Sequence, residues 1–426
     1  MHDRAGAGGP ATGGGHRALA AVVAATATTS LPVFLAGALA VQIRQALGFG
    51  TAGLGIAVAA FYLAASAGSF PAGLIAERWD AAHMMRAAAV FSGITLILTA
   101  LVIRSWLGLV GLLAAAGVAA SMVQPAANAF LFREVAPRRQ GAAFGIKQSA
   151  IPLATVLSGL AAPGIALTVG WRSAFGCAAA LCGASALALR RQRGQRPSQV
   201  RAQAKDHSRG RMLPLAVLTI GFALGVAAAT AFTAFVVTSG VSAGLAKGVA
   251  GLVAALSGAV AIAVRLLAGM RADRRGRGDF RTVAIMLVAG AAGYVTLALS
   301  ALTHVSFLFI PAAALASGMG WGWNGLFNFG LVRSYPLVPG FATGVSQTGS
   351  RLGAVIAPIL FGVLARESYP AAWLCCAGMA LSAGIAMVVA RHLLPHTPHS
   401  GDGKPRTSLG GQSEGPERGD AALWRQ

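Results

Sequence analysis

Hydrophobic residues follow one another in long stretches along this chain of 426 residues. Each stretch holds about 20 residues, enough for a helix to cross the hydrocarbon core of a bilayer. Short polar or glycine-containing segments separate them. The pattern predicts twelve membrane-spanning helices, at about residues 18–40, 52–75, 84–103, 107–132, 142–168, 171–189, 213–237, 248–270, 282–302, 305–332, 341–364 and 371–393.

The polar segments divide the predicted helices into two groups of six. A basic linker at 190–212 separates a first bundle at 18–189 from a second bundle at 213–394. Residues 1–17 and 395–426 are rich in Gly, Pro and charged side chains, so we expect them to be disordered tails. The predicted fold class is an all-α integral membrane protein with two six-helix bundles.

The second half of the sequence repeats the first. Residues 141–149 (GAAFGIKQS) align with residues 340–348 (GFATGVSQT), which lie 199 positions later. At nearly the same spacing, residues 73–78 (GLIAER) align with residues 269–274 (GMRADR). Two matches at one spacing indicate two pseudo-symmetric copies of a membrane unit, an architecture typical of secondary transporters.

Composition agrees with a membrane location and explains the unusual net charge. The mean hydropathy is +0.67, and only 11% of the residues are charged. The net charge of +22 suggests nucleic-acid binding at first. However, with a cytoplasmic amino terminus only five of the 34 Lys and Arg residues lie in outer segments. This positive-inside bias predicts a multi-pass plasma-membrane protein with both termini in the cytoplasm. The basic linker then needs only the anionic membrane lipid as a partner.

Two short motifs carry a resemblance to a known family. Residues 269–277 (GMRADRRGR) resemble the loop signature G-x-x-x-D-R-x-G-R of the major facilitator superfamily, and residues 170–175 (GWRSAF) resemble the start of its sixth helix. In the first-half copy of the loop, Glu77 replaces the acid and Asp80 stands where glycine is expected. The resemblance covers residues 18–394 and implies alternating access between the two bundles.

The loop signature implies a gate on the inner face. An acid at the end of one helix can pair with Arg side chains and with the start of another helix, and these contacts must break for inward opening. The alternative is that the loops only obey topology and make a tight turn. The gating candidates are Gly73, Glu77, Arg78, Gly269, Asp273, Arg274, Gly276 and Arg277.

Polar side chains at membrane depth are the candidate substrate ligands, because each is costly to bury there. They occur on the helices that line the cavity in the superfamily. The candidates are Arg351, Gln347, Lys147, Gln148, Asn128, Gln124, Asn324, Asn328, Trp323, Thr29 and Tyr62. Alternatively, the Thr side chain bonds its own helix and the Trp only packs. We expect Arg265 to extend towards the inner surface.

No Asp or Glu lies deep in a predicted span. Proton-driven exporters of cations usually need such a carboxylate, whereas Arg351 would make the cavity electropositive. The sequence therefore favours a small anionic or neutral polar solute, moved by secondary active or facilitative transport. An efflux transporter for drugs or metabolites is the alternative, and a sensor or scaffold with this fold is a further one.

Enzymatic activity is not expected. The sequence has no catalytic cluster, no metal-ligand spacing and no phosphate-binding loop, so we expect no cofactor and no metal. We expect a monomer with a small-molecule substrate and no nucleic-acid partner. Residues 145–153 (GIKQSAIPL) resemble the fifth helix of cyanate-type small-solute transporters and of actinobacterial members of the superfamily.

Overall fold

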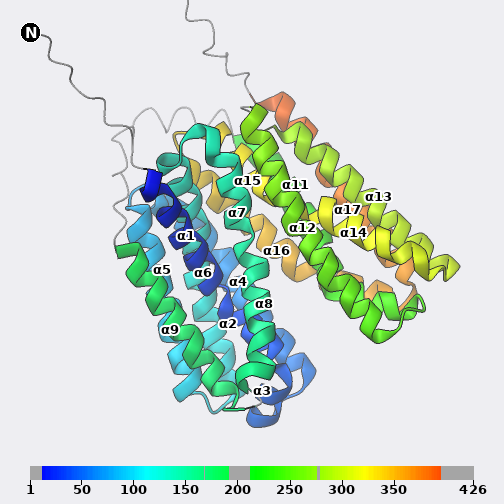
Figure 1. The fold of residues 1–426 in the computed structure, drawn as a ribbon, viewed down its shortest axis with the longest axis horizontal. Helices are drawn as coiled ribbons and strands as arrows, with labels where there is room; N and C mark the ends of the chain where they lie inside the picture. Colours follow the sequence, from blue (N-terminus) through cyan, green and yellow to red (C-terminus); the bar gives the residue numbers. More distant parts are fainter. Residues whose placement is uncertain (1–11, 167, 191–211, 276–278, 395–426) are drawn as a thin grey trace, which may run out of the picture. The chain divides into compact units, whose positions relative to one another are not determined.

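The computed structural model describes residues 12–166, 168–190, 212–275 and 279–394. In these residues the protein consists of two helical bundles. The first bundle runs from blue to green in Figure 1, and the second from green to orange. The first contains α1 (Thr12–Thr28), α2 (Leu31–Ala38), α3 (Ala40–Leu47), α4 (Thr51–Ala76), α5 (Ala81–Leu101), α6 (Trp106–Glu134), the 3₁₀ turn η1 (Pro137–Arg139), α7 (Gln140–Gln148), α8 (Ala150–Ala161), the π turn η2 (Ala162–Ala166) and α9 (Trp171–Arg190).

The second bundle is built from longer helices. It contains α11 (Met212–Ser242), α12 (Lys247–Arg275), α13 (Phe280–Thr303), α14 (Ser306–Gly322), α15 (Asn324–Ser334), α16 (Pro339–Glu367) and α17 (Tyr369–Leu393). Among the described residues, ten helical segments are long and apolar enough to span a membrane, counting Pro137–Ala166 (η1, α7, α8 and η2) as one. The bent pair α1–α2 raises the number to eleven. The one remaining predicted span, residues 305–332, is covered by the pair α14–α15. The predicted fold class is confirmed.

Three predicted spans are broken helices. Residues 18–40 form α1 and α2, which meet at a bend of 46° just before Pro32. Residues 142–168 divide at Ser149, and residues 305–332 divide at Trp323. Proline lacks an N–H and crowds the preceding turn, so it accounts for the bend beside Pro32. Periodicity alone predicts continuous helices at these places.

The segment limits differ from the predicted ones in two places. Helix α1 begins at Thr12, inside the segment 1–17 that we expected to be a disordered tail. The sequence also gave no separate prediction for α3, a short helix after α2. Most of the predicted linker and the whole carboxyl-terminal tail lie outside the described residues, as do residues 1–11.

Local signals explain where several helices begin. Asp80 accepts a hydrogen bond from the backbone N–H of His83 and caps α5, and Asp279 caps α13 in the corresponding place of the second bundle. Ser105 and Ser368 cap α6 and α17 in the same way. Such caps satisfy donors that the first helical turn leaves free.

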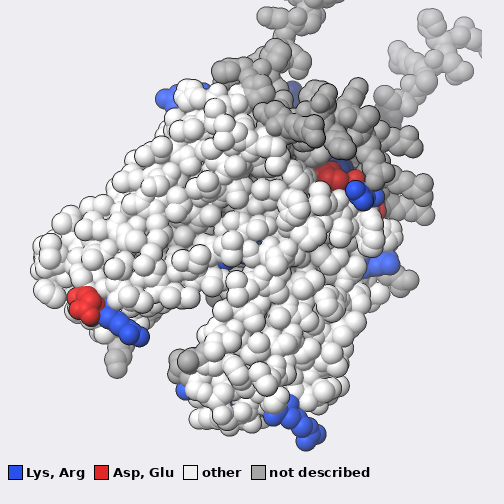
Figure 2. All heavy atoms as spheres, turned by 180° about the vertical axis from the view of Figure 1, so that it is seen from behind, with Lys and Arg blue, Asp and Glu red and all other residues white. Residues whose placement is uncertain are grey.

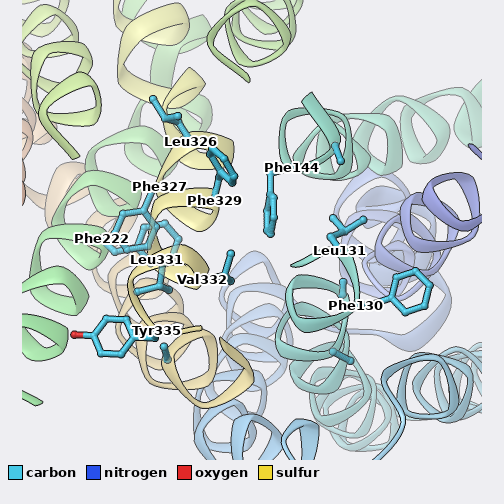
Figure 3. Close-up of a cluster of buried hydrophobic side chains, with 14 of the residues drawn as sticks. Phe130, Leu131, Phe144, Phe222, Leu326, Phe327, Phe329, Leu331, Val332 and Tyr335 are labelled. Carbon is cyan, nitrogen blue, oxygen red and sulfur yellow. The ribbon is translucent and has the colours of Figure 1, made fainter. Parts of the chain in front are cut away.

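A buried hydrophobic cluster joins the two bundles near one end. Phe144 on α7 and Phe329 on α15 face each other across the bundle boundary, with ring centroids 6.0 Å apart (Figure 3). On the second-bundle side, Phe222 stacks on Phe327 at 4.2 Å. We call this the closed end, because the contacts described below also join the bundles there.

Candidate functional site

A cavity of about 820 Å³ lies between the two bundles. Helices α1, α2, α4, α6, α7 and α8 line it from the first bundle, and α11, α12, α14, α15 and α16 from the second. Figure 2 shows the hollow between the two bundles and a surface that is largely uncharged elsewhere. Seven predicted substrate ligands line the cavity: Thr29, Tyr62, Gln124, Gln148, Asn324, Gln347 and Arg351.

Arg351 projects from α16 into this cavity. Its Nη2 donates to the backbone oxygen of Ala120 at 2.9 Å, across the bundle boundary. Its Nε has no hydrogen-bond partner among the described residues. Ser350 and Gln347, also on α16, are bonded to each other at 3.2 Å beside it. A guanidinium with an unused donor is suited to bind an oxyanion or a hydroxyl group.

A buried polar network forms the floor of the cavity and joins the bundles. Lys147, whose side chain is 0% exposed, donates to the amide oxygens of Gln124 and Asn128. Asn128 in turn donates to Asn328 at 2.8 Å and to Thr343 at 3.1 Å, both in the second bundle. Lys147, Asn128 and Asn328 therefore hold the floor together and do not line the cavity wall.

A second link across the same floor runs between Gln148 and Asn324. The Gln148 side-chain amide donates to the Asn324 oxygen, which also accepts from Asn328 at 3.0 Å. Opening the closed end would separate these pairs, together with the Asn128 contacts. Because buried amides lose free energy when unpaired, the network favours the arrangement seen here.

Trp323, a predicted ligand, is packed inside the second bundle. Its side chain is buried, and its Nε1 donates to the backbone oxygen of Gly320 at 2.7 Å. The ring meets Phe222 and Phe327 edge-on. Trp323 is therefore part of the hydrophobic cluster of the closed end. It packs against neighbouring side chains and does not line the cavity.

Thr29 lines the cavity, but its hydroxyl is already used. It donates to the backbone oxygen of Ala25 at 2.8 Å. Thr26, Thr230 and Thr233 make the same bond to the carbonyl four residues earlier. This is the usual behaviour of threonine in apolar helices. The Arg, Gln and Asn side chains therefore supply the more available polar groups of the cavity.

Arg265 departs from the sequence-based expectation. It is 3% exposed and lines the cavity instead of extending to the surface. Its Nη1 donates to the backbone oxygen of Gln148 at 3.2 Å, and its Nε and Nη2 donate to that of Trp321 at 3.3 and 3.2 Å. The guanidinium also lies over the Trp321 ring, 5.2 Å from its centroid.

The position of Pro152 explains the contact with Gln148. In a continuous helix the Gln148 carbonyl would accept from the N–H four residues later, but that residue is Pro152 and has none. Arg265 supplies the missing donor from the opposite bundle. The spacing of a proline four residues after a polar residue is a local signal for a free carbonyl, but nothing local identifies the donor.

The two predicted gating acids occupy equivalent positions at the closed end. Asp273 at the end of α12 accepts from the backbone N–H groups of Gly141 and Ala142, at 2.6 and 2.7 Å, and so caps α7. Glu77, directly after α4, accepts from those of Gly340 and Phe341, at 2.5 and 3.0 Å.

The surroundings of Glu77 contain groups that raise its pKa and groups that lower it. Burial raises its pKa above the ordinary value, while the backbone donors Phe341 and Gly340 and the nearby Arg133 lower it, and the raising effect is larger. Arg133 lies 3.4 Å from the Glu77 carboxylate. The less regular first-half motif therefore makes the same kind of contact as the second-half one.

Glycines let the helices approach closely beside both acids. A Cβ at Gly73 would lie 2.9 Å from the Cα of Gly344, and one at Gly141 would lie 2.5 Å from the backbone oxygen of Gly269. Such distances leave no room for a side chain. Of the other gating candidates, Arg78 and Arg274 are exposed, while Gly276 and Arg277 lie outside the described residues.

The lining of the cavity contains no Asp or Glu among the described residues. The same part of the chain has no group of three His, Cys, Asp or Glu side chains that could hold a metal ion. Arg265 and Arg351 are the charged residues of the described lining, which makes the cavity electropositive.

Comparison with known proteins identifies the family. The model of the Major Facilitator Superfamily matches residues 18–337, and the chain belongs to this superfamily of transporters. It is a multi-pass membrane protein and not an enzyme. No curated protein sequence matches the chain significantly.

Solved structures show the same fold at low sequence identity. The superfamily transporter FucP in the outward conformation has a TM-score of 0.71 and 14% identity, covering 87% of this chain and 98% of that chain. The proton:xylose symporter XylE, bound to 6-bromo-6-deoxy-D-glucose, has a TM-score of 0.65 and 16% identity, covering 88% and 94%. A variant of the E. coli fucose:proton symporter FucP has a TM-score of 0.65 and 14% identity, covering 87% and 98%.

Proposed function

We propose that this protein is a secondary active or facilitative transporter that carries a small anionic or neutral polar solute by alternating access. The observation that carries the proposal is Arg351, a cation in the cavity whose Nε is unpaired among the described residues. Gln347 and Ser350 stand beside it as neutral hydrogen-bonding groups. A carboxylate, a phosphate or a sugar hydroxyl would complete the bonds of this cluster.

The proposed orientation places the closed end in the cytoplasm and both termini on that side of the plasma membrane. The bias of Lys and Arg towards the loops at this end supports it. The conformation is then outward-facing, with the inner side shut by the caps of Asp273 and Glu77. For inward opening, these caps and the network around Lys147 would separate.

Uptake by proteoliposomes tests the substrate class. The panel holds labelled small organic anions, including cyanate, neutral polar solutes such as fucose and xylose, and lipophilic cations. Anion or sugar uptake should fall at least tenfold in Arg351→Ala, because the guanidinium would contact the solute directly. The matched control is Arg366→Ala, which removes an exposed arginine from the same helix. Solute uptake that is equal in both variants and the wild type would refute the role of Arg351.

A drug or metabolite efflux transporter is the second candidate, and the apolar part of the cavity wall favours it. Phe34, Phe232 and Ile262 contribute to that wall. Uptake of lipophilic cations into inverted vesicles, driven by a pH gradient and insensitive to Arg351→Ala, would select this alternative. A sensor or scaffold would move none of the solutes.

A further inference from the structure

A second, smaller cavity of about 410 Å³ lies within the second bundle and shares no lining residue with the substrate cavity. Helices α12, α13, α14 and α15 line it at the level of the closed end. Its charged lining residues are Arg271, Arg275 and Asp279. The rest of the wall is Val264, Leu267, Ala268, Ala272, Thr282, Met286, Met319 and Leu326.

The two arginines are available for an external ligand. Arg271 and Arg275 stand one turn apart on α12, hence on the same face of the helix. Neither makes an ion pair within the described part of the chain. The one acid of the lining, Asp279, is already engaged: it caps α13 and lies 3.4 Å from Arg391.

Apart from Thr282, the remainder of the cavity wall is apolar and continues onto a lipid-facing surface. Leu267, which lines it, is 60% exposed, and Met270 and Ile285 on the neighbouring surfaces of α12 and α13 are also exposed. In a membrane protein such exposed apolar side chains face the acyl chains. The cavity is therefore basic at the end nearest the membrane surface and apolar towards the hydrocarbon core.

We infer that this cavity binds an anionic phospholipid, with its phosphate between Arg271 and Arg275 and part of an acyl chain against Leu267, Met286 and Met319. A soluble phosphate would satisfy the arginines but would leave the apolar wall uncovered. A lipid without a phosphate would leave the arginines unpaired, and in a zwitterionic lipid the cationic headgroup would offset the attraction of the phosphate to two arginines. Basic pockets between helices on the cytoplasmic side suit anionic headgroups. The placement in the inner leaflet rests on the orientation in the proposed function.

Lipid retention during purification tests the inference without any transport measurement. The full-length protein is reconstituted with phosphatidylcholine and phosphatidylglycerol, extracted in mild detergent, and its bound lipids are counted by native mass spectrometry. We expect retained phosphatidylglycerol to fall roughly 10- to 30-fold in Arg271→Gln/Arg275→Gln. Each arginine near an anionic headgroup should raise the affinity for the lipid by roughly three- to fivefold, and the two factors multiply. The matched control is Arg274→Gln/Arg281→Gln, which removes two exposed arginines outside the cavity lining.

Three outcomes would overturn the inference. Equal loss of lipid in both double variants would mean that only the general charge of this face attracts it. Retention of phosphatidylcholine as strong as that of phosphatidylglycerol would exclude recognition of the headgroup charge. Displacement of the lipid by millimolar inorganic phosphate would identify a soluble anion as the ligand.

Met319→Gln should weaken lipid retention while both arginines remain. Since no outcome depends on solute uptake, failure here leaves the proposed function intact.

Discussion

The contact between Arg265 and the Gln148 carbonyl leads to a quantitative prediction. Arg265→Met keeps a long side chain but removes all three hydrogen bonds to the carbonyls of Gln148 and Trp321. A buried carbonyl without a donor costs about 1–3 kcal/mol. Two carbonyls without donors should therefore lower the free energy of unfolding by about 2–6 kcal/mol. The net loss is smaller, because Arg265→Met also removes the cost of burying a cation.

A double-mutant cycle with Pro152 isolates one of these bonds. Pro152→Ala restores an N–H four residues after Gln148, so the helix itself can satisfy the carbonyl. In that background the cost of Arg265→Met should be smaller by about 1.5–3 kcal/mol, the net contribution of one hydrogen bond with a charged donor. The free energy of unfolding in mixed micelles measures all four proteins of the cycle.

Pro358 provides the matched control for this cycle. It is another proline inside a spanning helix, α16, but the carbonyl four residues before it belongs to Ala354, to which Arg265 does not donate. Pro358→Ala should therefore leave the cost of Arg265→Met unchanged. A coupling to Pro152 that is near zero, or no larger than the coupling to Pro358, would refute the argument that Arg265 replaces the missing donor.

Three further predictions concern the closed end, measured as the distance between spin labels on the two bundles there. Gly344→Val should open it, because even a Cβ would lie 2.7 Å from the facing glycine Cα, whereas Gly159→Val has open space and should not. Asp273→Ala should raise the ratio of open to closed molecules by roughly 2- to 30-fold, from about 0.5–2 kcal/mol for the loss of a helix cap. Asp80→Ala, which removes a cap within one bundle, should leave this ratio unchanged. The raised pKa of Glu77 means that the closed end binds its proton more readily than an open end would, so acid pH should favour closure. The effect should be full below the ordinary pKa of Glu and should fade as pH rises through the raised value. A pH response of undiminished size in Glu77→Gln would contradict the role of Glu77.

Much of the architecture follows from local sequence. Spans of about 20 apolar residues, two repeated segments and the Lys and Arg bias are properties of short windows, and bilayer thickness converts them directly into helices. The repeat also indicated that residues 77 and 273 hold equivalent positions. The breaks at Ser149 and Trp323 were not predicted, because an apolar stretch has the same composition whether its helix is continuous or broken.

The candidate site was only partly predictable. Polarity at membrane depth selected Arg351, Gln347, Gln148 and Gln124, all of which line the cavity. The same criterion also selected Lys147, which is held by amides in the floor, and it left out Arg265. The apolar residues around a polar side chain in the sequence indicate that burying it is costly. They do not indicate which residue will bond to it and offset that cost.

The sequence by itself determined the membrane class, the two six-helix units and the set of polar residues available for a site. Only the tertiary structure decided their partners. Asp273 caps a helix through residues that lie 132 and 131 positions earlier, and Glu77 caps another through residues that lie 263 and 264 positions later. Helix formation in a bilayer depends on neighbouring residues, since each backbone group bonds within its own segment. Contacts between the bundles depend instead on how two finished surfaces pack, and that information is distributed over the whole chain.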